Sequence, residues 1–582
     1  MVIRAWTFVI YSKDMKFHWK AATPQPSLCA QLSKASNISP LLAQCLVNRG
    51  LCEPEGISRF LQPRLKHLAD PWLLPNMEAA VERLLKARQR GELLVILGDY
   101  DVDGVTATAL LIETLGALGW KLAHYLPRRL EEGYGFSREA VKNCLEQFPA
   151  NLLLAVDCGS TSCDSVAALA QKGIDVIVLD HHQVSTPPPA AVAIVNPQLG
   201  SAFQELCSVG LAFKLVHALV KRMRERNLTD AAEPDLRIHL DLVALGTIAD
   251  LVPLQGENRI FVTTGLERLN ATRRPGLLAL KAVAKSPALL GGYEVAFQLA
   301  PRLNAAGRME NAEQALRLLL ARSVEEAEPI ARGLDGQNRR RQDIERGICE
   351  EVIASLRERF DGAKDFVIVE GRAAWHIGVV GIVAARVLRE FYRPTVILGG
   401  DGAMWRGSGR SIEGFDLAAA LRGCNDLLAR HGGHAMAAGM TLAAEKVDLF
   451  RARLNELARQ ALKPAQLQPS LAIDAEVGLA DLTADRVEEL GQLEPSGQGN
   501  PAVRLALRGL SQQQAPQRMG RESRHVKFRV TDGKDTLEAV WWNGGRAPWP
   551  DGRFDLAVTA AINDYKGRRS VQLKLLDWRP RG

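Results

Sequence analysis

The chain has 582 residues, of which 47% are hydrophobic and 24% charged, and its formal net charge is +7. A length of this order predicts roughly three to five domains, and the composition excludes a disordered or low-complexity protein. The mild basic excess is compatible with a polyanionic partner but does not establish one. Nine cysteines occur without a CxxC pair or zinc-ligand spacing. This pattern argues against a disulfide scaffold and favours reduced thiols in the cytoplasm.

Residues 1–75 are predicted to be an N-terminal extension and a helical lead-in that prolines divide into short pieces. The apolar stretch at 5–11 is short for a signal-peptide core and has no small-residue cleavage site after it. No apolar run approaches the ~20 residues that a membrane helix needs. We therefore expect a cytoplasmic protein that does not enter the membrane.

Strands and helices alternate along residues 92–200, which is the βαβ pattern of a doubly wound parallel sheet. Residues 205–335 are expected to be mostly helical, with a buried segment at 241–250 that ends in an acid. Together these features predict an α/β domain at 76–325. The expected strands are 92–98, 122–126, 151–156 and 174–180, and helices are expected to start at 104, 137 and 163.

A charged amphipathic stretch predicts a connecting helix over 326–360. A second α/β domain is expected at 361–462, with strands at 365–369 and 394–398. The region 463–582 opens with a proline-containing linker and continues with short alternating strands, which predict a small β-barrel. The predicted fold class is therefore α/β, with two α/β domains joined by a long helix and a barrel resembling an OB-fold at the C-terminus.

Acidic side chains follow three of the predicted strands. Because open α/β sheets bind ligands at the carboxyl ends of their strands, we expect these side chains to lie close together. A lone acid after a strand is equally well explained as a helix cap, but acids and histidines at three strand ends favour a ligand site. The residues are Asp99, Asp101 and Asp103 after the first strand, Asp157 after the third, and Asp180, His181 and His182 after the fourth.

Carboxylates and imidazoles without thiolates suit Mg²⁺ or Mn²⁺. Alternation along an extended segment would point Asp99, Asp101 and Asp103 to one side, where neighbouring carboxylates bridge two ions. Two such ions stabilise the attacking and leaving oxygens of an in-line displacement at phosphorus. The pattern therefore favours a metal-dependent hydrolase.

Four segments resemble the motifs of the DHH phosphoesterase superfamily: Gly98–Gly104, Val156–Gly159, Asp180–His182 and Gly246–Leu254. That superfamily includes pyrophosphatases, phosphodiesterases of short RNA and cyclic dinucleotides, and the RecJ single-stranded-DNA exonucleases. Many DHH phosphatases have a histidine where this chain has Leu97, and this departure favours the RecJ branch. Six further segments resemble RecJ specifically: 131–135, 301–308, 375–381, 407–411, 431–434 and 494–501.

The resemblance implies a role for each residue of the motifs. Asp101 and Asp103 would serve both as metal ligands and in catalysis, and Asp99 would be a ligand or would support one. Asp180 would orient the imidazoles, and His182 would face the scissile phosphate or the second metal. The implied metal ligands are Asp99, Asp101, Asp103, Asp157, His181 and Asp250.

The substrate-binding residues implied by the resemblance are Tyr134, Arg302, Arg308, Ser408, Arg410 and His434. Taken alone, the arginines are more typical of a protein surface, and the glycine-rich segment around His434 is more typical of a helix start with a tight turn. Each aromatic side chain of the barrel has two possible roles: it stacks on DNA bases, or it belongs to the core of the barrel. Those aromatic residues are Phe528, Trp541, Trp542 and Tyr565.

The resemblance implies a 5′-to-3′ exonuclease that uses two Mg²⁺ or Mn²⁺ ions, releases 5′-mononucleotides from single-stranded DNA, and acts in recombination and repair. A single-strand-binding protein and a helicase are its expected partners, and a monomer is expected. One alternative is a phosphodiesterase of short oligonucleotides or cyclic dinucleotides, which has no need of the barrel. Another is a non-catalytic DNA-binding scaffold, although such proteins lose the acids and histidines that this chain retains.

Overall fold

The computed structural model describes residues 17–133, 135–200, 203–228, 234–400, 402–546, 552–565 and 567–581. The apolar stretch at 5–11 and Tyr134 lie outside these residues. The described chain divides into two compact units. Unit 2 comprises Ser58–Arg341 and Leu493–Pro501. Unit 1 comprises the described residues up to Ile57, together with Gln342–Gln492 and the residues from Ala502 onward.

A five-stranded, all-parallel sheet forms the centre of unit 2, in the order β3-β2-β4-β5-β6. This confirms the predicted βαβ pattern. The chain passes from β2 to β3 on one side and returns to β4 on the other, so the strand order reverses beside β2, where such sheets bind ligands. The strands are β2 (Leu93–Gly98), β3 (Lys121–Tyr125), β4 (Leu152–Val156), β5 (Asp175–Leu179) and β6 (Ala193–Val195).

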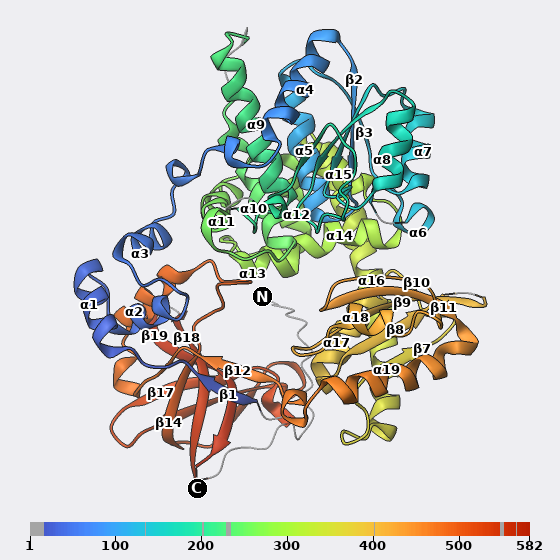
Figure 1. Cartoon of the computed structure of the whole chain (residues 1–582). Coiled ribbons are helices and arrows are strands. Elements are labelled where there is room, and N and C mark those ends of the chain that lie inside the picture. Colours follow the sequence, from blue (N-terminus) through green and yellow to red (C-terminus); the bar gives the residue numbers. More distant parts are fainter. Residues whose placement is uncertain are drawn as a thin grey trace. The chain divides into compact units, whose positions relative to one another are not determined.

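Helices cover both faces of this sheet, which explains why its strands are continuous apolar runs. Leu94 and Ile96 belong to the core on one face, whereas Val95 and Leu97 belong to the core on the other. Figure 1 shows the helices of the two layers on opposite sides of the strands. The first layer contains α4 (Met77–Arg90), α5 (Val102–Ala117) and α9 (Ser208–Glu225), and the second contains α7 (Arg138–Gln147) and α8 (Cys163–Gln171).

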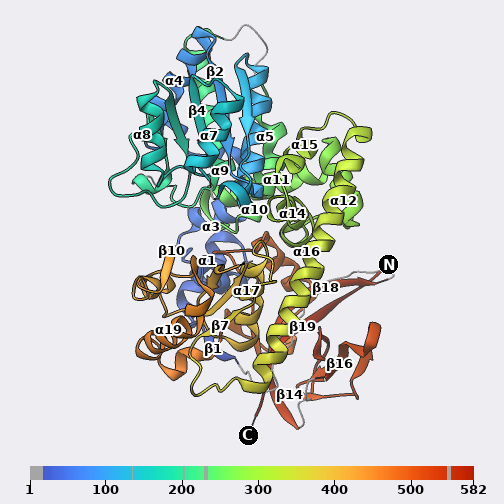
Figure 2. The same ribbon diagram turned by 90° about the vertical axis from the view of Figure 1, so that its right-hand side faces the viewer.

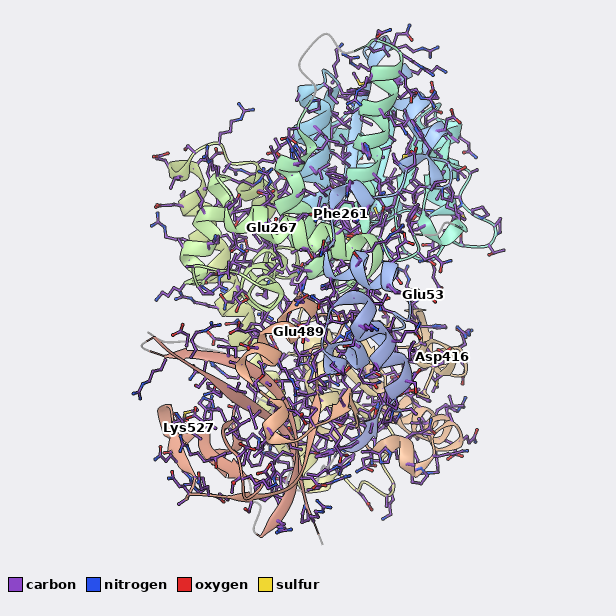
Figure 3. All side chains as sticks on the ribbon, turned by 90° about the vertical axis from the view of Figure 1, so that its left-hand side faces the viewer. Glu53, Phe261, Glu267, Asp416, Glu489 and Lys527 are labelled. Atoms are coloured by element: carbon purple, nitrogen blue, oxygen red, sulfur yellow. The ribbon has the colours of Figure 1, made fainter. Side chains whose placement is uncertain are left out.

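The rest of unit 2 is mostly helical, as predicted. On α11, Phe261 is fully buried and Glu267 is exposed, so these two side chains mark opposite faces of the helix (Figure 3). The helices are α6 (Arg129–Glu132), α10 (Leu240–Ala249), α11 (Gly256–Asn270), α12 (Pro275–Ala284), α13 (Gly292–Glu294), the π-helical turn η5 (Val295–Leu299), α14 (Ala300–Met309) and α15 (Glu313–Leu320).

One long helix, α16 (Val324–Arg359), runs from unit 2 into unit 1 (Figure 2). The predicted connecting helix is therefore confirmed. Its 36 residues include Pro329, which lies in the first two turns and interrupts few of the helical hydrogen bonds.

The α/β part of unit 1 has a mixed sheet in the order β10-β11-β9-β8-β7. The first strand begins three residues later than expected, because the backbone N–H groups of Phe366 and Val367 donate to Asn455 Oδ1 at 2.8 and 3.2 Å. The strands are β7 (Ile368–Gly371), β8 (Thr395–Gly399), β9 (Met404–Arg410), β10 (Leu428–Gly433) and β11 (Ala437–Ala443). The helices are α17 (Val380–Phe391), α18 (Leu417–Arg422) and α19 (Val447–Ala461).

The C-terminal strands close into the predicted barrel. Their order is β13-β14-β18-β19-β17-β16-β15, and an additional pairing of β14 with β16 closes the sheet. They are β13 (Ala475–Glu476), β14 (Leu505–Gln512), β15 (Gln517–Met519), β16 (His525–Thr531), β17 (Thr536–Trp541), β18 (Arg553–Tyr565) and β19 (Arg568–Pro580). The helix α20 (Ala484–Leu490) accompanies them.

The N-terminal region contains a strand that sequence reasoning missed. β1 (His18–Ala21) pairs in parallel with β12 (Ser470–Ile473) in unit 1. Four residues give too little alternation to predict a strand. The helices that follow each begin at a proline, which suits the first turn of a helix: α1 (Pro26–Ser36), α2 (Pro40–Val47) and α3 (Pro54–Leu61). Among the described residues, no helix has the length and apolarity needed to cross a membrane.

Candidate metal centre

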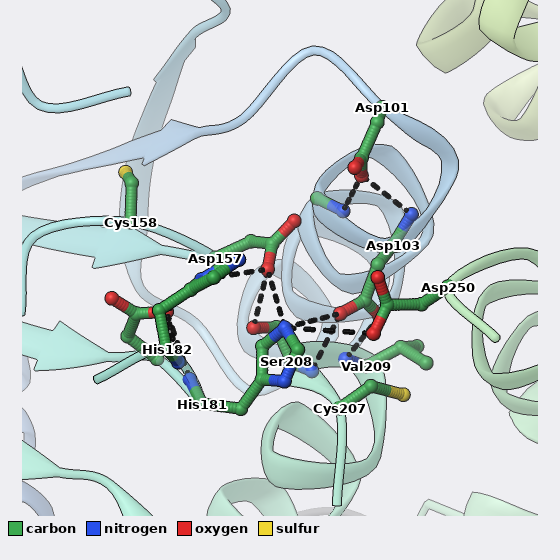
Figure 4. Close-up of polar contacts among 12 residues, drawn as sticks. Asp101, Asp103, Asp157, Cys158, His181, His182, Cys207, Ser208, Val209 and Asp250 are labelled. Atoms are coloured by element: carbon green, nitrogen blue, oxygen red, sulfur yellow. Dashed lines mark hydrogen bonds and ion pairs between the residues drawn. The ribbon is translucent and has the colours of Figure 1, made fainter. Parts of the chain in front are cut away.

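The segment with three acids does not remain extended after β2. Asp101 is the N-cap of α5, and its Oδ1 accepts hydrogen bonds from the N–H groups of Asp103 and Gly104 at 3.0 and 3.2 Å (Figure 4). The expectation that simple strand alternation would align Asp99, Asp101 and Asp103 is therefore wrong. A helix cap is the alternative explanation for an acid that follows a strand, and Asp101 does form such a cap. The turn into α5 leaves Asp99 and Asp101 in one group with Asp157, and Asp103 in another with His181 and Asp250.

Gly104 allows α5 to start against the backbone of Asp99. A Cβ at position 104 would lie 2.6 Å from the carbonyl oxygen of Asp99, and real side chains do not tolerate such contacts. Asp99 is buried, and among the described residues its Oδ1 has no hydrogen-bond partner. Burying a carboxylate oxygen without a hydrogen-bond partner is unfavourable unless the oxygen coordinates a metal ion or binds another ligand.

The start of α9 holds two of the acids. The N–H groups of Ser208 and Val209 donate to the two oxygens of Asp103 at 2.6 and 2.8 Å. The Ser208 hydroxyl donates to Asp157 Oδ1 at 2.9 Å. Sequence reasoning missed Ser208, although a serine opening a strongly apolar helix is a signal for a role at the helix N-terminus.

His181 points among three carboxylates from different elements. Its Nε2 lies 3.4 Å from Asp157 Oδ1, 3.5 Å from Asp250 Oδ2 and 4.0 Å from Asp103 Oδ2. Asp157 follows β4 with a left-handed backbone, φ +63°, and Asp250 is at the end of α10. In the described part of the chain, His181 Nε2 has no hydrogen-bond partner.

Asp180 contacts one of the two imidazole rings. Its Oδ1 lies 2.8 Å from His182 Nδ1, and its Oδ2 accepts from the N–H of Ser160 at 3.0 Å. Burial opposes ionisation of Asp180, but the bond with His182 outweighs it and holds the pKa of this carboxyl below its usual range. Burial likewise disfavours the charged ring of His182, yet the Asp180 bond raises its pKa to about 9. The positioning role predicted for Asp180 therefore has its geometric basis at His182.

The structure brings together all six predicted metal ligands, with His182 beside them. In each of three overlapping groups, the possible ligand atoms lie within 4.8 Å of one another. The groups are Asp157 with His181 and His182, Asp103 with His181 and Asp250, and Asp99 with Asp101 and Asp157.

The electrostatics of this cluster fit a divalent cation. Burial and the neighbouring acids raise the pKa of Asp103 to about 6 and that of Asp250 to about 9, and they raise the pKa of Asp99 and Asp157 well above the usual range. Burial, with His182 nearby, lowers the pKa of His181 to about 4, so its ring is neutral and its lone pair is available. A hard cation would relieve the repulsion among the carboxylates, and it would give Asp99 Oδ1 and His181 Nε2 a partner to coordinate.

Positive side chains lie beside the cluster. Burial, with Arg129 and Arg341 nearby, lowers the pKa of Arg308 to about 10. The guanidinium of Arg129 lies 5.2 Å from the ring centroid of Tyr100. In the sequence, Tyr100 stands between Asp99 and Asp101. Sequence reasoning selected Arg308 but missed Arg129, which lies three residues before the Glu132-Gly133 pair of a RecJ-like segment. Clustered guanidinium groups are suited to binding phosphate.

The other predicted substrate residues differ in their surroundings. Arg302 is held by an ion pair, with its Nε donating to Asp335 Oδ1 at 2.9 Å. Ser408 and Arg410 lie together on β9 of unit 1, where an Arg410 terminal nitrogen donates to Ser408 Oγ at 2.9 Å. His434, in the same unit, is exposed. The substrate roles of these residues stay predictions.

The aromatic side chains of the barrel differ in how far they are exposed to solvent. Phe528 is buried, which fits a core position, whereas Trp542 is 51% exposed and packs edge-on against His525 with ring centroids 4.8 Å apart. Trp541 is half-buried. The side chain of Tyr565 lies outside the described part of the structure.

Three family models match the chain in succession. The N-terminal domain of the DHH family matches residues 93–247, the DHHA1 domain matches 364–460, and the RecJ OB domain matches 473–577. The chain is 36% identical to the single-stranded-DNA-specific exonuclease RecJ of Escherichia coli, over 92% of this chain and 95% of that protein. The chain belongs to the RecJ family.

Other members of the RecJ family are also similar to this chain in sequence and structure. The RecJ exonuclease of Bacillus subtilis is 36% identical over 97% of this chain and 71% of its own length. The crystal structure of Thermus thermophilus RecJ in complex with Mn²⁺ superposes with a TM-score of 0.83 at 31% identity, covering 97% of this chain and 80% of that one. The Mg²⁺ complex of the same protein gives a TM-score of 0.78 at 29% identity, over 97% of this chain and 78% of that one.

Proposed function

We propose that this RecJ-family chain is a single-stranded-DNA-specific exonuclease that depends on Mg²⁺ or Mn²⁺. One observation carries the proposal: all six predicted metal ligands converge at the point where the strand order of the sheet reverses. The names of its relatives support the substrate, and the Mn²⁺ and Mg²⁺ complexes of the Thermus protein support the choice of ions. We extend the proposal to digestion from the 5′ end with release of 5′-mononucleotides.

In this proposal the six ligands hold two ions. When bound, such ions make a nucleophile available at neutral pH and stabilise the attacking and leaving oxygens of an in-line displacement. Asp180 would hold the His182 ring through Nδ1 and so orient the other ring nitrogen toward the scissile phosphate or the second ion. Arg308 and Arg129 offset charge on the phosphate beside the acids.

The proposal includes roles for unit 1 and for partners. Ser408, Arg410 and His434 would donate to backbone phosphates of the strand, and Tyr134 and Arg302 would assist in unit 2. We propose action in recombination and repair as a monomer, with a single-strand-binding protein and a helicase as partners. A cytoplasmic location is proposed because all nine cysteines are free thiols.

Digestion of end-labelled DNA tests this function. Single strands labelled at the 5′ or the 3′ end, and matched duplexes, are incubated with Mn²⁺ or EDTA and the wild-type chain, Asp101→Ala or Asp164→Ala. We expect immediate release of the 5′ label as mononucleotide from single strands only, with no release in EDTA. Asp101→Ala should lower the rate at least about 100-fold, as loss of a group central to catalysis does.

Asp164 is the matched control, because it is an exposed acid of unit 2 whose ion pair is with the exposed Arg138. Its replacement should leave the rate unchanged. Intact long strands together with hydrolysis of dinucleotides would replace the proposal by a small-substrate phosphodiesterase. DNA binding without hydrolysis in any metal would replace it by a scaffold.

A further inference from the structure

Two large aromatic side chains are exposed side by side in unit 2. Tyr293, on α13, is 51% exposed, and Phe297, on η5, is 62% exposed. Their ring centroids lie 4.8 Å apart, with the ring planes tilted by 37°. Neighbouring exposed apolar side chains are a feature of binding surfaces, whereas single ones scattered over a surface are ordinary. The π-helical turn that carries Phe297 is itself a feature found frequently at functional sites.

The aromatic pair is connected to the metal centre by short contacts within unit 2. The loop at 494–500 contacts a residue next to the aromatic pair and a residue near Asp250 in the sequence: a Cβ on Gly292 would be 3.4 Å from the carbonyl oxygen of Ser496, and the N–H of Leu254 donates to the carbonyl oxygen of Gln498 at 2.7 Å. Leu254 follows the predicted ligand Asp250 by four residues. In addition, η5 packs against α10, whose C-terminus bears Asp250.

A third exposed apolar side chain lies close to Asp250 in the sequence. Leu251, directly after Asp250, is 64% exposed and has a left-handed backbone with φ +61°. This conformation is strained for a bulky residue and persists only where the surroundings impose it. Leu251 thus presents an apolar side chain to solvent next to the predicted ligand Asp250.

The local charge favours a polyanion over an apolar protein helix. Residues 271–309 contain a single acid, Glu294, and six arginines and lysines. Arg274 and Arg302 are engaged in ion pairs and Arg308 lies beside the metal centre. The positive side chains that remain are Arg273, Lys281 and Lys285. The carboxylate of Glu294 is engaged by the N–H of Gly291 at 2.9 Å. Lys281 lies on α12, which packs against η5. A positive surface with exposed aromatic rings is the combination that proteins use to bind single-stranded nucleic acid.

We propose that Tyr293 and Phe297 form a platform on which bases of the single-stranded substrate stack. The inference rests on the proposed function and adds to it a specific subsite in unit 2. Because the base faces of duplex DNA are already stacked on one another, the platform contributes to the preference for single strands. It positions the substrate and takes no part in the bond-breaking step.

Binding of fluorescent oligonucleotides in EDTA separates this proposal from catalysis. The full chain is titrated into single strands that carry 2-aminopurine, whose emission falls when the base stacks. The wild type should quench the probe at one part of the strand. The double variant Tyr293→Ala/Phe297→Ala should lose this quenching and bind about tenfold more weakly, because each stacked base contributes about 1–3 kcal/mol. The pair Tyr293→Phe/Phe297→Trp should bind like the wild type.

An abasic strand makes the test specific to stacking. Wild-type affinity should fall to that of the double variant when the bases at the quenched positions are removed, and the double variant should not distinguish the two strands. Leu73→Ala is the matched control, because Leu73 in unit 2 is also 62% exposed but lies in a different part of that unit's sequence. It should bind normally.

The outcomes that overturn the platform differ from those that overturn the proposed function. A double variant that binds within twofold of the wild type, or that loses equal affinity for normal and abasic strands, overturns the platform and points to a protein partner for the exposed rings. A wild type that stacks the probe but hydrolyses no DNA in Mn²⁺ overturns the proposed function and leaves the platform. A wild type that binds no single strand overturns both.

Discussion

Asp157 depends on a neighbour that is not itself a predicted ligand. Ser208 donates its hydroxyl proton to Asp157 Oδ1, while its N–H donates to Asp103. Such supporting bonds orient ligating carboxylates, and their loss typically costs about 10- to 100-fold in metal affinity. Because Ser208→Ala removes only the hydroxyl, Asp103 keeps its two backbone donors.

We therefore predict that Ser208→Ala raises the Mn²⁺ concentration for half-maximal nuclease activity about tenfold, with little change in the maximal rate. A Mn²⁺ titration of DNA hydrolysis measures both quantities. Ser165→Ala, a buried serine on α8 in the same unit, is the control and should behave as the wild type. An unchanged Mn²⁺ requirement would mean that the hydroxyl does not support the ligand.

Five of the six predicted ligands stand directly after strands, so residue type and place in the chain suffice to group them, whereas Asp250 ends helix α10 and was implied only by the family resemblance. Acids and histidines directly after apolar strands must meet at one edge of a parallel sheet. Ser208 and Arg129 were not predictable in this way. Ser208 acts through a hydroxyl and a backbone N–H that reach two acids only in the folded chain, and Arg129 depends on how α6 lies against Tyr100. The aromatic pair also escaped prediction, since exposure is a property of the folded surface.

At the scale of elements, the packing of α5 against β2 depends on Gly104. Since a Cβ there would lie 2.6 Å from Asp99 O, we predict that Gly104→Ala destabilises unit 2 by about 1–3 kcal/mol and weakens Mn²⁺ binding. Urea unfolding and a Mn²⁺ titration measure these effects. Gly336→Ala on α16 is the control, because nothing lies within 4 Å of its added methyl group.

Gly336→Ala should be neutral or stabilising by up to about 1 kcal/mol, since alanine is the better helix former. Equal behaviour of the two alanine variants would contradict the close approach of α5 to the Asp99 backbone.

A partly buried ion pair between Glu113 and Arg274 joins α5 to the start of α12. Burial would raise the pKa of Glu113, but bonds with His239 and Arg274 outweigh it and lower the pKa from 4.5 to about 2. This difference corresponds to about 3 kcal/mol. Because the folded-state pKa is the lower one, the stabilisation is complete above pH 4.5 and is lost as the pH falls toward 2.

Glu113→Gln should therefore unfold at lower urea than the wild type at pH 7, and the two should converge as the pH approaches 2. Hydrogen exchange in α5 reports the same change locally. Glu267→Gln, at an exposed position of α11, should follow the wild type at every pH. A Glu113→Gln deficit that is equal at pH 7 and pH 3 would contradict the electrostatic account.

The boundaries of elements were the least predictable part of the fold. Helix α5 starts at the acids because Asp101 caps it, and a cap cannot be distinguished from a ligand by sequence alone. The strand β1 was missed because its pairing with β12 joins residues about 450 positions apart, which no local pattern reveals.

At the scale of the whole molecule, the chain forms two units that we expect to respond separately to mutation. Trp19 of β1 donates its Nε1 proton to Asp577 Oδ2 at 2.7 Å, and the guanidinium of Arg579 lies 4.5 Å from its ring centroid. The N-terminal strand is thus fastened to the barrel within unit 1 by a hydrogen bond and a cation–π contact.

We predict that Trp19→Ala destabilises unit 1 by about 2 kcal/mol, below the range for a fully buried tryptophan because the ring is half-buried. Hydrogen exchange should accelerate in β12 and β19 and stay unchanged in β2 and β4 of unit 2. Lys20→Ala, an exposed position on the same strand, serves as the control. Faster exchange in unit 2, or unchanged exchange in β12, would contradict this assignment.

The convergence of the acids and histidines in unit 2 is the central claim, and anomalous diffraction from crystals grown with MnCl₂ tests it most directly. We predict two anomalous peaks within the cluster, with Asp99, Asp101, Asp103, Asp157, His181 and Asp250 supplying the ligand atoms. The absence of a peak among these side chains, or Mn²⁺ bound only elsewhere in the chain, would contradict it.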